Sequence, residues 1–156
     1  MSVHGKFVSK SNNMHRFILD HGIKVFGFEV ENSPEGIGEA FNDLVTRVGG
    51  GFRRQYYGIC ESKNGCPIYI AAAEATYEGE GHQFGLEEFE IEEGEYLAVI
   101  IREWRKKTES IKDVFQEMFD DDRVDCSKPF VEWYKDDDEM ICMVRVHPHG
   151  NINETL

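Results

Sequence analysis

Residues 130–134 read Phe130-Val131-Glu132-Trp133-Tyr134, a short β-type run with a single carboxylate among aromatic and apolar side chains. Side chains alternate between the two faces of an extended strand, so Glu132 shares its face with Phe130 and Tyr134. A carboxylate within a concave aromatic wall is costly to desolvate unless a cation or a hydrogen-bond donor meets it, which makes Glu132 a candidate anchor for a positively charged ligand. The alternative is that the run is an edge strand and that Glu132 faces water.

The surrounding residues form a strand-helix-strand-strand unit. Its elements are a strand at 89–102 with a turn or bulge at 92–94, a helix capped by Thr108 or Ser110, and strands at 129–135 and 140–146 joined by the polar turn 136–139. The helix prediction rests on apolar residues at helical spacing, namely Ile111, Val114, Phe115, Met118 and Phe119. Such a stripe must pack on another element.

The first half of the chain repeats this order. Its elements are a strand at 23–31, a helix with Ser33 as cap and Pro34 as its first residue, and strands at 54–61 and 67–77 joined by the Asn64-Gly65 turn. The helix carries an apolar stripe and ends at Gly49; the stripe consists of Ile37, Phe41, Leu44, Val45 and Val48. A polar connector at 78–85 joins the two units.

This internal duplication predicts an α+β fold, because neither half has enough strands to build a core alone. We expect repeat one at 23–77 and repeat two at 86–147 to share one curved, mainly antiparallel sheet. Both helices should pack on one face, with a ligand groove on the other. Residues 1–22 are expected to be a loosely attached lead-in that contributes at most one edge strand, and residues 148–156 a tail.

The formal charge of −13 excludes nucleic acid as a direct partner, because such binding depends on Lys and Arg neutralising phosphates. The acidic field would instead attract cationic small molecules, or serve only to keep the protein in solution. No apolar run approaches the roughly 20 residues needed to span a bilayer, and the first residues lack the apolar core of a secretion signal. We expect a cytoplasmic protein without a membrane partner, as a monomer or a homodimer.

Neither a metal nor another cofactor is expected. The four cysteines, Cys60, Cys66, Cys126 and Cys142, form no C-x-x-C pair. Cys60 and Cys142 lie in apolar strand-like runs, where a free thiol behaves as a small hydrophobe. The His147-Pro148-His149 sequence lacks supporting acids.

Over residues 23–147 the chain resembles the GyrI-like (gyrase-inhibitor-like) small-molecule-binding family, which also supplies the effector-binding domains of AraC-type and multidrug-responsive regulators. The similar segments are Tyr56-Tyr57-Gly58-Ile59, the run 91–99 with its Gly94 and Tyr96, and Pro129–Tyr134 with its Glu132-x-Tyr134 pattern. Regulators of this family carry a helix-turn-helix domain ahead of the module. The 22 residues before the first strand are too few for one, so we do not expect direct transcriptional control.

The resemblance implies a pocket in which Glu132 meets cationic, lipophilic ligands with Tyr134 beside it. Tyr96 corresponds to a strand tyrosine of the family, and Gly58 to the first-half counterpart of Glu132. Tyr56 and Cys60 would share the face of Gly58, where a glycine opens room for a ring, and Phe130 would share the face of Glu132. For Tyr56, Tyr57, Tyr69 and Trp104, core packing remains at least an equal alternative, because the strand register is not fixed by the sequence.

Three functions follow from these residues. The first is a standalone binding protein for a hydrophobic, cationic aromatic compound, for sensing, sequestration or drug protection. The second, implied by the resemblance, is an enzyme that opens cyclopropane-bearing genotoxic natural products, with Glu132 as general base and Tyr134 or Tyr96 as donor. The third is an acidic inhibitor of a macromolecular partner, although acidic runs such as 136–139 are also typical of solvated turns. Composition does not separate a catalyst from a receptor.

Overall fold

The computed structural model describes residues 5–11, 14–49 and 53–148. Their strands are β1 Gly5–Ser11, β2 Met14–Leu19, β3 Ile23–Glu29, β4 Tyr56–Lys63, β5 Cys66–Glu74, β6 Glu87–Ile91, β7 Gly94–Arg102, β8 Phe130–Tyr134 and β9 Glu139–Arg145. The helices are α1 Ile37–Val48, α2 Glu80–Gln83 and α3 Ile111–Phe119, with the 3-10 turns η2 Trp104–Lys106 and η3 Thr108–Ser110 before α3.

The described strands form one sheet with the order β1-β2-β7-β9-β8-β4-β5-β3-β6, and its pairs are antiparallel. The first unit consists of β3, α1, β4 and β5, and the second of β7, α3, β8 and β9. Both units place their strands in the same relative order, so β4 of the first unit and β8 of the second meet at the centre of the sheet. The predicted α+β fold with two units in one antiparallel sheet is therefore confirmed.

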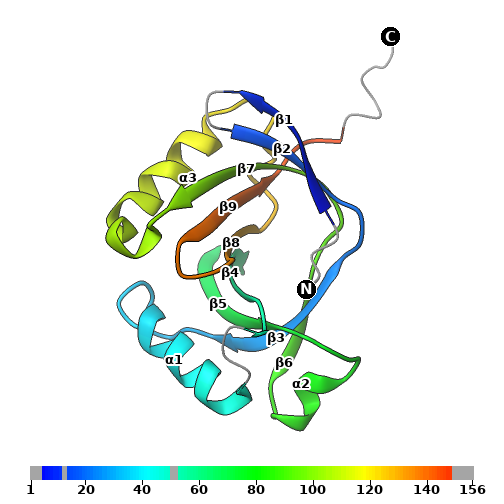
Figure 1. Ribbon diagram of the computed structural model, residues 1–156, viewed down its shortest axis with the longest axis vertical. Helices are drawn as coiled ribbons and strands as arrows, with labels where there is room; N and C mark the ends of the chain where they lie inside the picture. Colours follow the sequence, from blue (N-terminus) through cyan, green and yellow to red (C-terminus); the bar gives the residue numbers. More distant parts are fainter. Residues whose placement is uncertain (1–4, 12–13, 50–52, 149–156) are drawn as a thin grey trace.

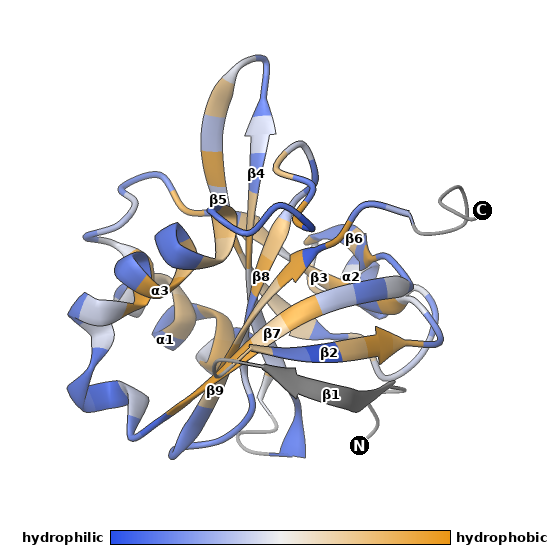
Figure 2. Cartoon of the chain, turned by 90° about the horizontal axis from the view of Figure 1, so that it is seen from above, coloured by the Kyte–Doolittle hydropathy of each residue, from blue (hydrophilic) through white to orange (hydrophobic). Residues whose placement is uncertain are grey.

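Both longer helices pack on the same face of the sheet, as predicted (Figure 1). On the first unit, Leu44 of α1 is buried in a cluster with Phe26 and Ala71. On the second unit, Phe115 and Met118 of α3 are buried in a cluster of strand side chains. Figure 2 shows the hydrophobic residues concentrated in the central strands, while much of the outer surface of α1 and α3 is polar.

The opposite face of the sheet is closed rather than grooved. The sheet curls so that its outer strands surround a core that includes Phe17 and Leu19 of β2, Tyr57 of β4 and Trp133 of β8 (Figure 1). Because this side is filled with buried side chains, the expected ligand groove on the helix-free face is wrong. The cleft lies between the helices and the sheet.

Two segments differ from their predicted form. The helix of the first unit begins at Ile37 with Gly36 as N-cap, and Ser33 makes no capping bond because Ser33 and Pro34 belong to a preceding turn with a cis peptide between them. Residues 14–19 form a full strand within the sheet, with Phe17 2% and Leu19 1% exposed, instead of a loosely attached lead-in.

The interruption at 92–94 separates two strands with different partners. β6 pairs with β3 of the first unit, while β7 pairs with β2 and β9. The connector before β6 contains α2, whose Glu80 is 4% exposed. Arg54 forms two hydrogen bonds with its carboxylate, at 2.8 and 2.9 Å, and these bonds attach α2 to the segment that leads into β4.

Candidate functional site

The centre of the sheet brings the two units into direct contact at Gly58 and Glu132. These residues are register partners in the β4–β8 pair, as expected for equivalent positions of the two repeats. Strand alternation places Val131 and Trp133 in the closed core, so Glu132 faces the helices.

Two tyrosine hydroxyls donate to one oxygen of the Glu132 carboxylate. The Tyr69 hydroxyl lies 2.5 Å and the Tyr134 hydroxyl 2.6 Å from Oε1, and the two hydroxyls are 3.3 Å apart. Among the described residues, no donor lies within hydrogen-bonding distance of Oε2. This oxygen is therefore available to a ligand.

Gly58 makes this arrangement sterically feasible. A Cβ at position 58 would lie 1.9 Å from the Tyr69 hydroxyl oxygen and 2.9 Å from Oε1 of Glu132. Real Cβ atoms do not approach other heavy atoms so closely, so the ring of Tyr69 occupies the space that a side chain at 58 would need. The room expected from this glycine is used by the protein's own tyrosine.

Burial raises the pKa of the Glu132 carboxyl above its usual value, and the hydrogen bonds from Tyr134 and Tyr69 oppose this rise. The pKa values of both tyrosines are raised well above the ordinary value, first by burial and then by the neighbouring Glu132. Among the described residues, no Lys or Arg forms a salt bridge with Glu132. Within this part of the chain, the ionised carboxylate thus has hydrogen bonds but no counter-ion.

Glu132 lines a cleft of about 1220 Å³ between α1, α3 and the sheet. This volume exceeds the roughly 300–1,000 Å³ of most small-molecule sites. The apolar and aromatic part of its lining consists of Ile37, Phe41, Val45, Tyr56, Tyr69, Trp104, Ile111, Phe115, Phe119, Phe130 and Tyr134. The cleft can therefore enclose a hydrophobic molecule that contacts the Glu132 carboxylate.

The aromatic rings hold one another in place around the carboxylate. Tyr134 packs between Phe41 and Trp104, with ring centroids 5.2 and 5.0 Å away. Phe130 packs on Phe115 and Phe119 at 4.7 and 5.0 Å. Since Trp104 also donates from Nε1 to the backbone oxygen of Asp136 at 2.8 Å, the turn after β7 is fixed against the β8–β9 turn.

The basic residues along the cleft are mostly engaged elsewhere. Arg105 lies over the Trp104 ring at 4.5 Å and pairs with Asp137 at 2.9 Å. Lys135 pairs with Glu139 at 3.1 Å. Lys112 also lines the cleft, and its side chain is exposed.

The structure brings together most of the residues singled out from the sequence. Glu132, Tyr134, Phe130 and Tyr56 line the cleft. Gly58 lies beneath Tyr69, as described above. Cys60 is partly buried and packs with the cluster under α1, and burial raises the pKa of its thiol.

Tyr96 does not belong to this site. Its side chain is 2% exposed and lies in the closed core on the opposite face, where its hydroxyl donates to the backbone oxygen of Glu92 at 2.5 Å. The expectation that it lines the pocket is therefore corrected. Tyr96 is the register partner of Arg145 in β9, and Val131 is the partner of Met143 two residues earlier in the same strand. Tyr96 therefore lies on the face of Val131 and not on that of Glu132.

Sequence reasoning left Tyr69 and Trp104 undecided between site and core. Tyr69 is one of the two donors to Glu132, and Trp104 lies against the other. The tight Asn64-Gly65 turn could have identified Tyr69, because a two-residue turn fixes the register of the hairpin. That register places Tyr69 opposite Cys60, on the face of Gly58.

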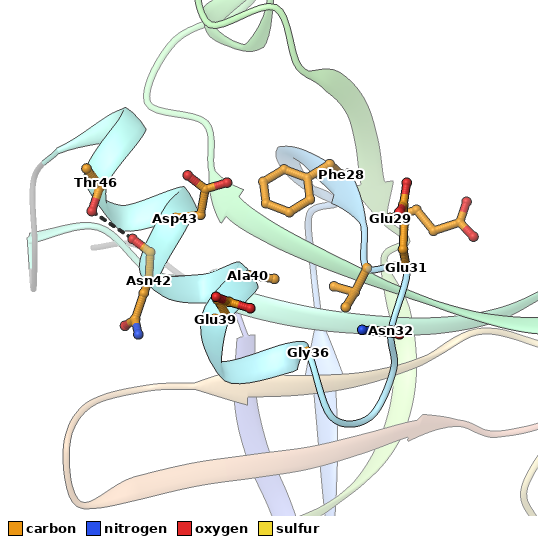
Figure 3. A pocket seen from close by; sticks show the side chains of 11 residues that line it. Phe28, Glu29, Glu31, Asn32, Gly36, Glu39, Ala40, Asn42, Asp43 and Thr46 are labelled. Atoms are coloured by element: carbon orange, nitrogen blue, oxygen red, sulfur yellow. Dashed lines mark hydrogen bonds between the residues drawn. The ribbon is translucent and has the colours of Figure 1, made fainter.

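A second, smaller hollow of about 770 Å³ lies between α1 and the end of β3 (Figure 3). Figure 3 shows four acidic side chains and the ring of Phe28 around this hollow. Glu39 and Asp43 belong to α1, Glu29 ends β3, and Glu31 follows it. Thr46 donates from Oγ1 to the backbone oxygen of Asn42 at 2.8 Å at its edge. Glu132 does not line this hollow.

Among the described residues, no cluster of three or more His, Cys, Asp or Glu side chains is arranged to hold a metal ion. None of the described helices has the length and apolarity needed to cross a membrane. Neither a protein-family model nor a curated protein matches the sequence.

Several solved structures share the fold. A Vibrio cholerae integron cassette protein, VCH_CASS2, is 14% identical with a TM-score of 0.68, over 88% of this chain and 98% of that one. SAV2435 bound to tetraphenylphosphonium is 11% identical with a TM-score of 0.56, over 90% and 96%. A hydrolase from Listeria innocua is 12% identical with a TM-score of 0.53, over 89% and 94%. At these identities the similarity establishes the fold, which occurs in a ligand-binding protein and in an enzyme.

Proposed function

We propose that this protein binds small hydrophobic cations in the cleft between its helices and sheet, with Glu132 as the charge partner. The observation that carries the proposal is a carboxylate at an aromatic cleft that, within the described part of the chain, has no basic partner and one oxygen without a hydrogen bond. A cation there gains charge pairing in a poorly solvated site together with contacts to ring faces. The complex of SAV2435 with tetraphenylphosphonium supports a cationic ligand class for this fold.

Binding of tetraphenylphosphonium and of neutral triphenylphosphine oxide tests the proposal. Glu132→Gln should weaken binding of the cation at least about tenfold, or about 1.4 kcal/mol, because the amide keeps the shape and the acceptor oxygen but not the charge. Binding of the neutral compound should change less than about twofold. Calorimetry measures both, and quenching of Trp104, which lines the cleft, provides a second signal.

Glu87→Gln is the matched control, since Glu87 is exposed on β6 and its replacement changes the net charge equally. It should leave both affinities near the wild-type values. Equal losses for the cation and the neutral compound in Glu132→Gln would remove the electrostatic role of Glu132.

A second candidate is hydrolysis of cyclopropane-bearing compounds, favoured by the raised pKa of Glu132 and its free Oε2. Glu132 would take a proton from water while the water oxygen bonds to a cyclopropane carbon. The electrons of the broken ring bond would move into a conjugated carbonyl, and the Tyr134 hydroxyl would donate to the phenolate that forms. Tyr96 cannot serve as this donor, because it lies on the other face. A time-dependent ring-opened product, absent in Glu132→Ala, would favour the enzyme, and saturable binding without product the receptor.

A further inference from the structure

The cleft has two similar lobes, one from each repeat. Ile37, Phe41 and Val45 of α1 line it, and Ile111, Phe115 and Phe119 occupy the same relative positions in α3. The strands continue the correspondence around the central Gly58–Glu132 pair, with Tyr56 of β4 equivalent to Phe130 of β8 and Cys60 equivalent to Tyr134. We call the α1 side the first lobe and the α3 side the second lobe.

The carboxylate at the floor of the cleft, that of Glu132, lies where the two lobes meet. Glu132 belongs to the central register pair, and its equivalent in the first repeat is the side-chain-free Gly58. A ligand whose positive centre contacts Oε2 therefore has hydrophobic wall on both sides. A cation with one apolar group would fill one lobe and leave the other to solvent.

The lobes also differ at Gly38 of α1 and its equivalent in α3, Lys112. Both residues line the cleft. With about 100° between successive helix residues, position 38 points in a direction between those of Phe41 and Asn42, which also line the cleft. A Cβ at Gly38 would meet no atom within 4 Å. Gly38 is exposed, so this open space lies at the rim of the first lobe, where any other residue would place a side chain.

We infer that the ligand is a cation whose charged centre lies between two hydrophobic arms, and that Gly38 determines the size of the arm accepted in the first lobe. This inference rests on the proposed function, because it assumes that Glu132 holds the charge. Glycine weakens the first turn of a helix relative to alanine. Its presence here leaves the rim of the first lobe open to the ligand.

Two permanent cations of equal charge test the inference. Benzyltrimethylammonium has one aromatic arm and dibenzyldimethylammonium has two. The wild-type protein should bind the two-armed cation at least about tenfold more tightly, since the extra ring buries about 150–250 Å² of aromatic surface. Gly38→Ala, Gly38→Leu and Gly38→Phe should reduce this ratio stepwise toward one, while affinity for the one-armed cation stays within about twofold.

Arg47→Leu is the control, because Arg47 lies on the same helix and does not line the cleft. It should leave the ratio of the two affinities unchanged. A ratio that is the same in wild type and Gly38→Phe would overturn the role of Gly38 while leaving cation binding at Glu132 intact. Failure of both cations to bind the wild-type protein would instead remove the proposed function and this inference with it.

Discussion

The two oxygens of the Glu132 carboxylate have different surroundings. Oε1 accepts two tyrosine hydroxyls, and these bonds favour the ionised group, whereas burial favours the protonated one. Burial is the larger effect, so the native pKa lies above the ordinary carboxyl value of 4.5. A carboxyl with a raised native pKa costs stability once it must ionise in the folded protein.

The upward shift of the Glu132 pKa predicts how the stability of Glu132→Gln depends on pH. The stabilisation that protonated Glu132 supplies is fully present below pH 4.5 and is lost as the pH rises through its native pKa. Glu132→Gln keeps the oxygen that accepts both tyrosines but never ionises. Its stability relative to wild type should therefore increase from pH 4 to pH 8, which thermal unfolding would detect at about 2–4 °C per kcal/mol.

Glu87→Gln supplies the reference for the same measurement, because Glu87 is exposed. Subtracting its difference from wild type at each pH leaves the part that is specific to the buried Glu132. If Glu132→Gln became relatively less stable as the pH rose, the carboxylate would have to be stabilised by a partner that the structure does not contain.

At the scale of elements, the site depends on the close approach of β4, β5 and β8. Gly58 of β4 leaves the space that the Tyr69 hydroxyl needs to reach Glu132. Gly58→Ala should destabilise the protein by about 1–3 kcal/mol, as overpacking does. It should also weaken cation binding, because the Tyr69 hydroxyl must move away from Oε1.

Gly38→Ala is the matched substitution, since a Cβ at Gly38 meets nothing within 4 Å. Replacing this helical glycine by alanine should stabilise the protein by up to about 1 kcal/mol, because alanine loses less conformational entropy on folding. Chemical denaturation of both variants separates the cases. A Gly58→Ala protein as stable as wild type would show that the β4–β5 hairpin shifts at no cost in free energy. In that case, the position of Tyr69 would not depend on a glycine at 58.

Much of the site could be predicted from the sequence because strand alternation is a local property. Alternation alone placed Phe130, Glu132 and Tyr134 on one face, and equivalence of the repeats paired Gly58 with Glu132. Tyr96 was misplaced because the face of β7 depends on its register with β9, which no local pattern fixes. The face that carries the cleft was also missed, since it depends on how far the sheet curls.

The whole molecule is held together by an exchange of strands that the duplication did not reveal. β2, which precedes the first unit in the chain, pairs with β7 of the second, and β6, which precedes the second unit, pairs with β3 of the first. Residues 14–19 show only a short apolar cluster in the sequence, so their place in the sheet depends on a partner almost eighty residues away. Each unit thus completes the sheet edge of the other.

This exchange predicts that the two units unfold together. Phe17 of β2 is 2% exposed, and its ring lies 6.3 Å from that of Trp133 in the second unit. Phe17→Ala should therefore destabilise the protein by about 3–5 kcal/mol, and the loss should affect both units because the closed core is shared.

With Trp104→Phe as background, Trp133 is the single tryptophan and its fluorescence reports on the core. Fluorescence and far-ultraviolet circular dichroism should then give coincident denaturation curves, in wild type and in Phe17→Ala. Two separated transitions would mean that the units fold independently, and a loss below about 1 kcal/mol would mean that β2 is not part of the cooperative core.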